Sequence, residues 1–167
     1  GVMFPMYQSE ALWLHFRGYY PFALKVAAGK INAVSGEAWR AGLNREPQDY
    51  VVTPDQPWLD GYAVEKGIIR QFVAEPLGQG ITAEEQITGK GEFGGIQLAA
   101  FPMKRAAYEH YFPPEPPSEV CYSMRDRPMF MASPSMGLAA GGRMRQEIME
   151  DDYQLEDWDT ENTSRCF

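Results

Sequence analysis

Cysteine and histidine are the scarcest reactive residues in this chain of 167 residues. It has two of each, Cys121, Cys166, His15 and His110. Two cysteines are too few for a disulfide scaffold, and one disulfide bond or two free thiols both stay open. Zinc needs about four ligands at regular spacing, a pattern that these scattered residues lack. The low cysteine content favours a reduced, cytoplasmic protein, with secretion as the alternative.

The sequence also has few basic residues and no long apolar run. The chain has 15 Lys and Arg against 23 Asp and Glu, a formal net charge of −8. Proteins that bind nucleic acids draw much of their affinity from clustered basic residues. No apolar run reaches the roughly 18 residues that a membrane-spanning helix needs. We therefore expect a soluble, acidic protein without a nucleic-acid partner or a membrane span.

Sequence signatures of catalysis are missing as well. The chain has no Gly-x-Ser-x-Gly nucleophile elbow, and Gly89-Lys90-Gly91 lacks the Ser or Thr of a P-loop. Residues 78–83 match the G-x-G-x-x-A pattern of dinucleotide-binding proteins. The helix that follows is too short for a βαβ crossover, so we interpret this segment as a turn.

Glycine, proline and aromatic residues are plentiful instead. Eight of the 16 glycines fall in residues 57–101, between short β-type runs, and glycine serves where the backbone turns sharply or approaches another strand closely. Alternating apolar residues predict a three-stranded meander over residues 11–17, 22–27 and 31–34. Residues 68–74 are apolar on both faces, which predicts a central strand.

Two short helices complete the predicted elements. Thr82 and Glu85 form a capping box, in which the hydroxyl of Thr82 accepts from the amide of Glu85 and the Glu85 carboxylate reaches back. Gly89 would end this helix within two turns. A second short helix is predicted within residues 103–111.

Together these elements predict a mainly β fold, an antiparallel β-sandwich or a barrel-like sheet with one or two short helices. We treat residues 1–167 as a single β-rich domain, with a sub-boundary at the Pro-rich segment 113–117. The core is expected to come from apolar strand residues on the inward face: Leu12, Leu14, Phe16, Phe22, Leu24, Val26, Ile69, Phe72, Ile96 and Leu98.

Residues 147–161 are rich in carboxylates. Asp157, Asp159 and Glu161 follow the opening spacing of a calcium loop, but Asn162 stands where an EF-hand needs Gly. A solvated acidic face is the preferred interpretation, and we predict no cofactor, with a calcium ion at these three carboxylates as the alternative. The sequon that begins at Asn162 matters only in a secreted protein.

Several segments across the chain share a pattern. They are Pro47-Gln48-Asp49-Tyr50, Pro57-Trp58-Leu59-Asp60-Gly61, Ile69-Arg70-Gln71-Phe72-Val73-Ala74, Glu85-Gln86 with Thr88-Gly89, Met136-Gly137-Leu138-Ala139, Gly141-Gly142, Met144-Arg145-Gln146 and Ser164-Arg165-Cys166-Phe167. In these segments the chain resembles an uncharacterised family of microbial and fungal hypothetical proteins. The resemblance implies no activity, cofactor or catalytic residue. It implies that related chains continue beyond Phe167, so that this chain is a fragment, a processed product or one domain of a longer protein.

For function, we predict a non-enzymatic structural or binding module that self-associates through strand edges or binds another protein. One alternative is a metal- or carboxylate-dependent hydrolase or isomerase, which would gather His15, Asp60, Glu65 and Arg70 in one polar pocket. The other is a module for a small ligand or a glycan, with tryptophans as stacking platforms. The candidate binding residues are Trp13, Trp58, Asp60, Tyr62 and Arg70.

Overall fold

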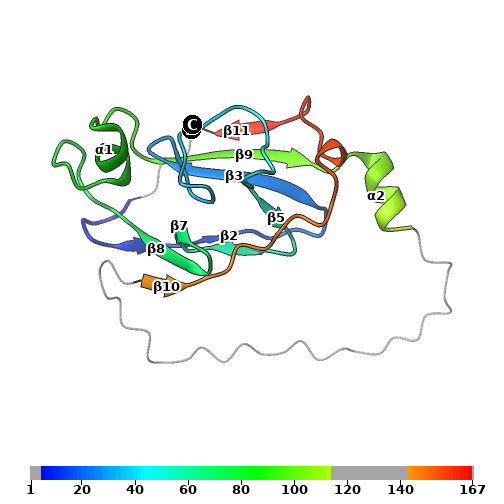
Figure 1. The fold of residues 1–167 in the computed structure, drawn as a ribbon, viewed down its shortest axis with the longest axis horizontal. Helices are drawn as coiled ribbons and strands as arrows, with labels where there is room; N and C mark the ends of the chain where they lie inside the picture. Colours follow the sequence, from blue (N-terminus) through cyan, green and yellow to red (C-terminus); the bar gives the residue numbers. More distant parts are fainter. Residues whose placement is uncertain (1–4, 114–142, 167) are drawn as a thin grey trace.

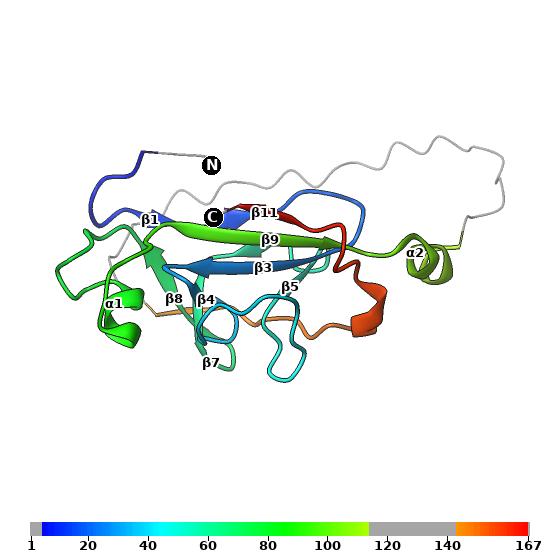
Figure 2. The ribbon, with the colours of Figure 1, turned by 90° about the horizontal axis from the view of Figure 1, so that it is seen from above.

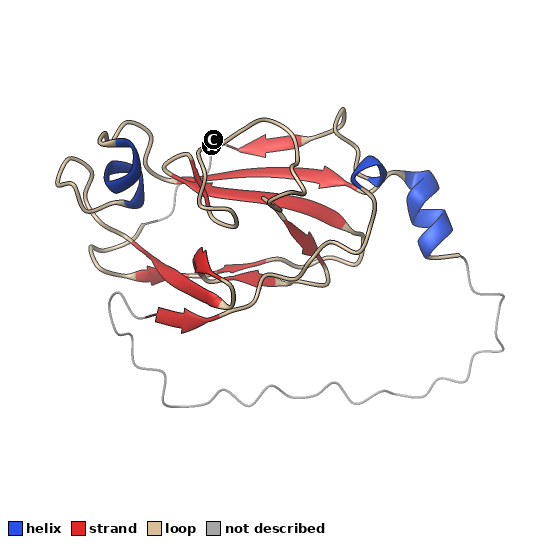
Figure 3. Ribbon diagram, viewed as in Figure 1, coloured by secondary structure: helices blue, strands red, loops and turns tan. Residues whose placement is uncertain are grey.

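The structure is a computed structural model that describes residues 5–113 and 143–166. It is mainly β, with several antiparallel sheets and two short helices, α1 (Ala83–Thr88) and α2 (Arg105–Tyr111) (Figures 1 and 3). Within the described ranges no sheet closes into a barrel. The predicted mainly β, antiparallel fold with two short helices is therefore confirmed. None of the described helices is long and apolar enough to cross a membrane.

The strands of the described residues form three sheets. The largest joins β11 (Ser164–Cys166), β9 (Ile96–Pro102), β3 (Phe22–Ala28) and β4 (Ile31–Asn32) in that order, and β5 (Val51–Thr53) also pairs with β3. The second joins β1 (Ala11–Leu12), β8 (Ile68–Val73) and β10 (Arg143–Arg145), and β7 (Gly61–Glu65) also pairs with β8. The third is the ribbon of β2 (Leu14–His15) and β6 (Trp58–Leu59). A 3-10 turn covers Leu155–Asp157.

The largest sheet is covered on both faces, as the view in Figure 2 helps to follow. Strands β3 and β9 pair over seven residues, from Phe22 opposite Pro102 to Ala28 opposite Ile96. One face carries Ala23 and Phe101 into a core with Tyr50 and Trp158. The other carries Val26 into a second core with Leu59, Phe72 and Ala33. Two hydrophobic cores therefore enclose this sheet.

The predicted core is only partly right. Val26, Ile69 and Phe72 are buried, whereas the other predicted core residues are half-buried: Leu12, Leu14, Phe16, Phe22, Leu24, Ile96 and Leu98. The face of β3 and β9 expected to point outward is the more deeply buried one, and it holds Ala23, Lys25, Ala27, Gln97, Ala99 and Phe101. Small residues on that face allow a second layer to pack closely against the sheet.

Lys25 is the polar centre of that face. Its side chain is 1% exposed and its Nζ lies 2.5 Å from the Oδ2 of Asp49, which is 8% exposed. The ammonium also donates to the carbonyl of Gly42 at 2.7 Å, and the other carboxylate oxygen of Asp49 accepts from the amide of Asn44 at 2.9 Å. Buried charges persist only when they are paired and hydrogen-bonded. This pair fastens the irregular segment 37–49 to the sheet.

The predicted meander over the first 36 residues is wrong. The run 11–17 is divided, because β1 pairs with β8 whereas β2 pairs with β6. Only the hairpin of β3 and β4 is as expected. Alternation along a strand indicates which residues share a face, but it does not indicate which strand becomes the partner.

Strand β8 is central in the second sheet, as predicted. Its residues 68–70 pair with both β7 and β10, which therefore occupy its two edges. Gly61 is the first residue of β7, and a Cβ there would stand 1.9 Å from the carbonyl oxygen of Arg70. Close approach of the two backbones requires glycine at this position.

The helix predictions are confirmed. Both halves of the capping box form between Thr82 and Glu85, and Gly89 ends α1 in the left-handed region with φ of 75°. Helix α2 covers Arg105–Tyr111. Apart from its first residue, the Pro-rich segment 113–117 lies outside the described residues, as does Cys121.

Candidate functional site

A cleft of about 900 Å³ lies between the α1 region and the sheet that contains β8. Figures 1 and 2 both show α1 at the end of the molecule where β1 and β8 lie. The cleft is lined by Leu12, Tyr62, Arg70 and Phe72 from the sheet. Leu77, Ile81 and Thr82 line it from the α1 side, and Ile96 of β9 also contributes. The lining also includes Gln71, Glu75, Glu84 and Gln86, so the cleft combines apolar side chains with several polar ones.

The sheet wall of the cleft follows from strand register. Leu12 is opposite Phe72, and Tyr62 is opposite Arg70. Residues directly opposite in an antiparallel pair share a face, as do residues two apart in one strand. All four side chains therefore lie on the cleft face of this sheet. The rings of Tyr62 and Phe72 meet edge to face, with centroids 4.9 Å apart.

Tyr62 is a hydrogen-bond donor in this wall. Its hydroxyl donates to the carbonyl of Ala28 at 3.4 Å. Burial, together with the nearby charge of Glu84, raises the pKa of Tyr62 to about 12. The phenol therefore stays protonated at neutral pH.

Glu84 organises the opposite wall. It is only 3% exposed, and its carboxylate accepts from the backbone amides of Glu92, Phe93 and Gly94 at 2.9–3.0 Å. Burial would raise the pKa of this carboxyl, but the three amides outweigh burial and hold the pKa below its usual value. The ionised carboxylate of Glu84 therefore holds the backbone of the loop that follows α1.

Glu85 does the same for the loop before α1. Its carboxylate accepts from the Thr82 hydroxyl at 2.7 Å, from the Thr82 amide at 3.1 Å and from the Gly78 amide at 2.6 Å. The bond from the Thr82 hydroxyl is the main cause that lowers the pKa of Glu85 to about 2. Both loops around α1 are thus held by ionised carboxylates, and the cleft has an organised wall although α1 has only six residues.

Arg70 supplies the cleft with a charge that no described residue neutralises. Its side chain is exposed and lines the cleft. The ion pairs among the described residues involve other side chains, and the guanidinium has no hydrogen bond within these ranges. It is available to a ligand.

The other predicted binding residues lie outside the cleft lining. Trp58 is 50% exposed in the β2–β6 ribbon, opposite His15, and Trp13, beside that ribbon, is 64% exposed. The backbone amide of Asp60 donates to Oε1 of Gln146 at 3.0 Å, and burial raises the pKa of the Asp60 carboxyl. Of the five predicted binding residues, the structure brings Tyr62 and Arg70 together and leaves Trp13, Trp58 and Asp60 elsewhere.

The candidate calcium ligands cap local turns. Asp159 accepts from the amides of Glu161 and Asn162 at 2.9 and 3.0 Å and from Nδ2 of Asn162 at 2.7 Å. Asp157 accepts from the Tyr111 hydroxyl at 2.9 Å. Among residues 5–113 and 143–166, no group of three or more His, Cys, Asp or Glu side chains is arranged to hold a metal ion. The described residues thus lend the calcium alternative no support.

One member of the acidic segment is not solvated at all. Asp151 is 3% exposed, and its carboxylate accepts from the Tyr50 hydroxyl at 2.5 Å and from Nε1 of Trp158 at 3.0 Å. Burial and this hydrogen bond raise the pKa of Tyr50. The interpretation of the whole segment as a solvated face is therefore wrong at Asp151, which ties the chain near its end to the core.

Sequence reasoning missed the apolar half of the cleft. Leu77 and Ile81 are each 47% exposed in the turn-rich segment before α1. Both are apolar residues among glycines and polar residues, and that local exception is the signal that could have identified them.

A scan against protein-family models and searches of curated proteins and of solved structures find no match. The resemblance to a family of hypothetical proteins therefore stays a prediction. A function for this chain has to be argued from the geometry of the cleft.

Proposed function

We propose that this chain is a non-enzymatic binding module whose cleft holds a small, largely apolar ligand. The observation that carries the proposal is the volume of about 900 Å³ between apolar side chains of two walls. Small-molecule sites typically have about 300–1,000 Å³, apolar walls and a few placed polar groups. Leu12, Phe72 and Ile96 form one side here, and Leu77 and Ile81 the other.

The organisation of the α1 wall supports the same proposal. Glu84 and Glu85 hold the two loops through backbone amides, so the wall is formed before any ligand arrives. Preorganisation lowers the entropy that binding must overcome. The half-exposed side chains of Leu77 and Ile81 would gain burial when a ligand covers them.

The residues that line the cleft favour binding over catalysis. The described lining residues include neither histidine nor cysteine. The two carboxylates of the lining are those of Glu75 and Glu84. Glu84 accepts from backbone amides and Glu75 accepts from the side chains of Gln8 and Ser9 at 3.1 Å, so both are engaged with the protein and poorly placed to exchange protons with a substrate. Of the residues that the enzyme alternative requires, only Arg70 lines the cleft.

A neutral fluorescent probe tests this proposal. We expect N-phenyl-1-naphthylamine to bind the full chain saturably, with a Kd on the order of 10–100 μM for a ligand of its size. Ile81→Ser should weaken binding at least about fivefold, because it removes apolar contact area. The matched control is Ile87→Ser, since Ile87 is 58% exposed and lies outside the lining. Titration of fluorescence gives each Kd, and equal losses in the two variants would place the probe elsewhere.

Self-association through a strand edge is the second candidate function. Among residues 5–113 and 143–166, strand β11 lies at the end of the largest sheet and pairs only with β9. An open edge can pair with the same strand of a second copy about a two-fold axis. This candidate ranks second because β11 has only three residues, which offer few hydrogen bonds.

Native mass tests self-association directly. We expect a discrete dimer at high concentration in light scattering, and a lower dimer fraction for Ser164→Lys, because an edge lysine opposes strand pairing. A chain that stays monomeric across the concentration range would contradict this candidate without affecting the cleft.

A further inference from the structure

We infer that the ligand of the cleft carries one anionic oxyacid group, which Arg70 and Arg143 hold between their guanidinium groups. The ligand class is thus an apolar body with a carboxylate, sulfonate or phosphate at one end. This inference rests on the proposed function of the cleft and adds the chemistry that the cleft recognises.

Strand register brings the two arginines together. Arg143 of β10 is directly opposite Arg70 of β8, and Tyr62 of β7 is opposite Arg70 on the other side. Directly opposite residues in antiparallel strands have Cβ atoms about 4.5–5.5 Å apart on one face. Tyr62, Arg70 and Arg143 therefore form a row across three strands. The row lies on the face that carries Phe72, which lines the cleft.

Two like charges in this position are unfavourable without a partner. Like charges directly opposite in a sheet destabilise it, and both arginines are exposed. Within the ranges that the structure describes, no carboxylate forms an ion pair with either guanidinium, although acidic residues outnumber basic ones in the chain. An anion between them would replace repulsion by two charge-assisted contacts, for which the guanidinium fork is well shaped.

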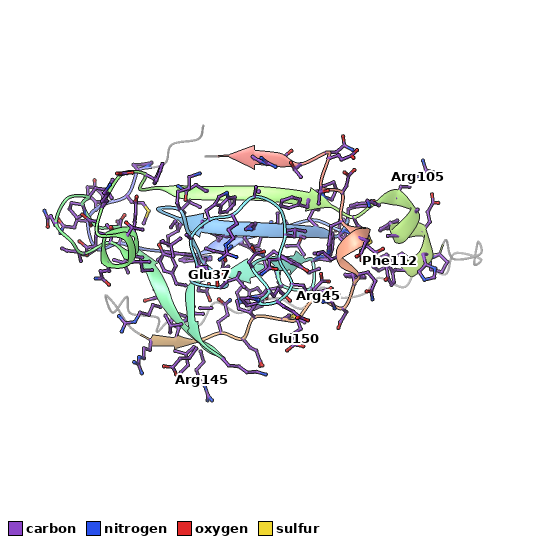
Figure 4. The ribbon with its side chains drawn as sticks, turned by 45° about the horizontal axis from the view of Figure 1, so that its top comes forward. Glu37, Arg45, Arg105, Phe112, Arg145 and Glu150 are labelled. Carbon is purple, nitrogen blue, oxygen red and sulfur yellow. The ribbon has the colours of Figure 1, made fainter. Side chains whose placement is uncertain are left out.

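The groove beside the pair is positively charged, whereas the cleft lining holds Arg70 together with the carboxylates of Glu75 and Glu84. Lys66, Arg143 and Arg145 line a shallow groove of about 470 Å³ at the rim of this sheet, together with the single acidic residue Glu147. Figure 4 shows Arg145 beside β10 and β8. The rim therefore attracts anions even though the whole chain is acidic.

The position of the pair relative to the cleft sets the shape of the ligand. Arg70 lines the cleft itself, and Arg143 stands one strand further out on the same face. A ligand whose apolar part contacts Leu77 and Ile81 would place its anionic end near the row of Tyr62, Arg70 and Arg143. The cleft thus separates an apolar subsite from an anion subsite.

Two probes with the same aromatic skeleton test the inference. 8-Anilinonaphthalene-1-sulfonate differs from N-phenyl-1-naphthylamine by one sulfonate, and each probe should displace the other from the full chain. We expect the sulfonate to bind about tenfold more tightly at low salt. Arg70→Gln and Arg143→Gln should each weaken sulfonate binding by about 3- to 10-fold, more than they weaken binding of the neutral probe. The preference should fall as salt rises.

The matched control removes the same charge elsewhere. Arg165 is exposed on β11, in the other large sheet, so Arg165→Gln should leave both affinities unchanged. The Tm of Arg143→Gln should equal or exceed that of the parent, because the substitution relieves repulsion. A loss of sulfonate binding in that variant then reports the anion subsite and not unfolding.

The outcomes separate the two proposals. If both probes bind equally and neither Arg variant changes their ratio, the anion subsite is refuted while the apolar cleft stands. If neither probe binds, the proposed function itself fails. An equal effect of Arg165→Gln would attribute the preference to overall charge and also refute the anion subsite.

Discussion

Gly61→Ala should lower the free energy of unfolding by about 2–3 kcal/mol, in the upper range for overpacking. The added Cβ would stand 1.9 Å from the carbonyl oxygen of Arg70, 2.5 Å from its carbonyl carbon and 2.9 Å from the Cα of Gln71. All three atoms belong to the backbone of the central strand β8, so no side chain can rotate to make room. Relief requires β7 to move away from β8, and β7 carries Tyr62 of the cleft wall. Urea unfolding measures the change.

Gly18→Ala is the matched control for that substitution. A Cβ at Gly18 meets no atom within 4 Å. We expect its unfolding midpoint to be unchanged or slightly raised, because alanine restricts the unfolded chain. If both alanine variants unfold at the same urea concentration as the parent, β7 and β8 do not approach as closely as the structure shows.

Lys25→Met should lower the free energy of unfolding by about 3–5 kcal/mol, the usual cost of removing one partner of a buried ion pair. The substitution keeps most of the side-chain volume but leaves the Asp49 carboxylate, 8% exposed, without its cation. Of the described residues, only Asn44 would still donate, through its amide, to the Asp49 side chain. Chemical unfolding gives the magnitude.

Lys90→Met is the corresponding control at the surface. Lys90 pairs with Glu92 at 3.5 Å, and its side chain is 73% exposed. An exposed pair contributes about 0–1 kcal/mol, so this variant should unfold almost as the parent does. Equal small effects of the two methionine variants would show that Lys25 is not the buried anchor of the segment 37–49.

Local patterns were enough to predict several elements. The capping box of Thr82 and Glu85, the end of α1 at Gly89 and the helix Arg105–Tyr111 all form as expected. The start and the end of α1 depend on hydrogen bonds and backbone angles within a few residues, which neighbouring side chains decide. The central position of β8 was also predictable, because it carries apolar residues on both faces, and Ile69 and Phe72 are buried on opposite sides.

Partner choice and burial depended on residues far apart in the chain. The sequence placed Lys25 on the outer face, yet the segment that contains Asp49 covers that face and supplies its counter-ion. The run 11–17 alternates like one strand, but its halves pair with two different strands. Periodicity states which residues share a face and does not state what packs against it.

The candidate site was also only partly predictable from the sequence. Tyr62 and Arg70 were identified from the sequence, Tyr62 as an aromatic stacking platform and Arg70 as a charged group of a polar pocket. Their partners Leu12 and Arg143 reach the same sheet face only through long-range strand pairing. The mainly β class, the α1 cap and the central strand follow from the order of residues alone, since local sterics and hydrogen bonds decide them. Tertiary structure alone decided the cleft and its paired arginines, because non-local strand register brings these side chains together.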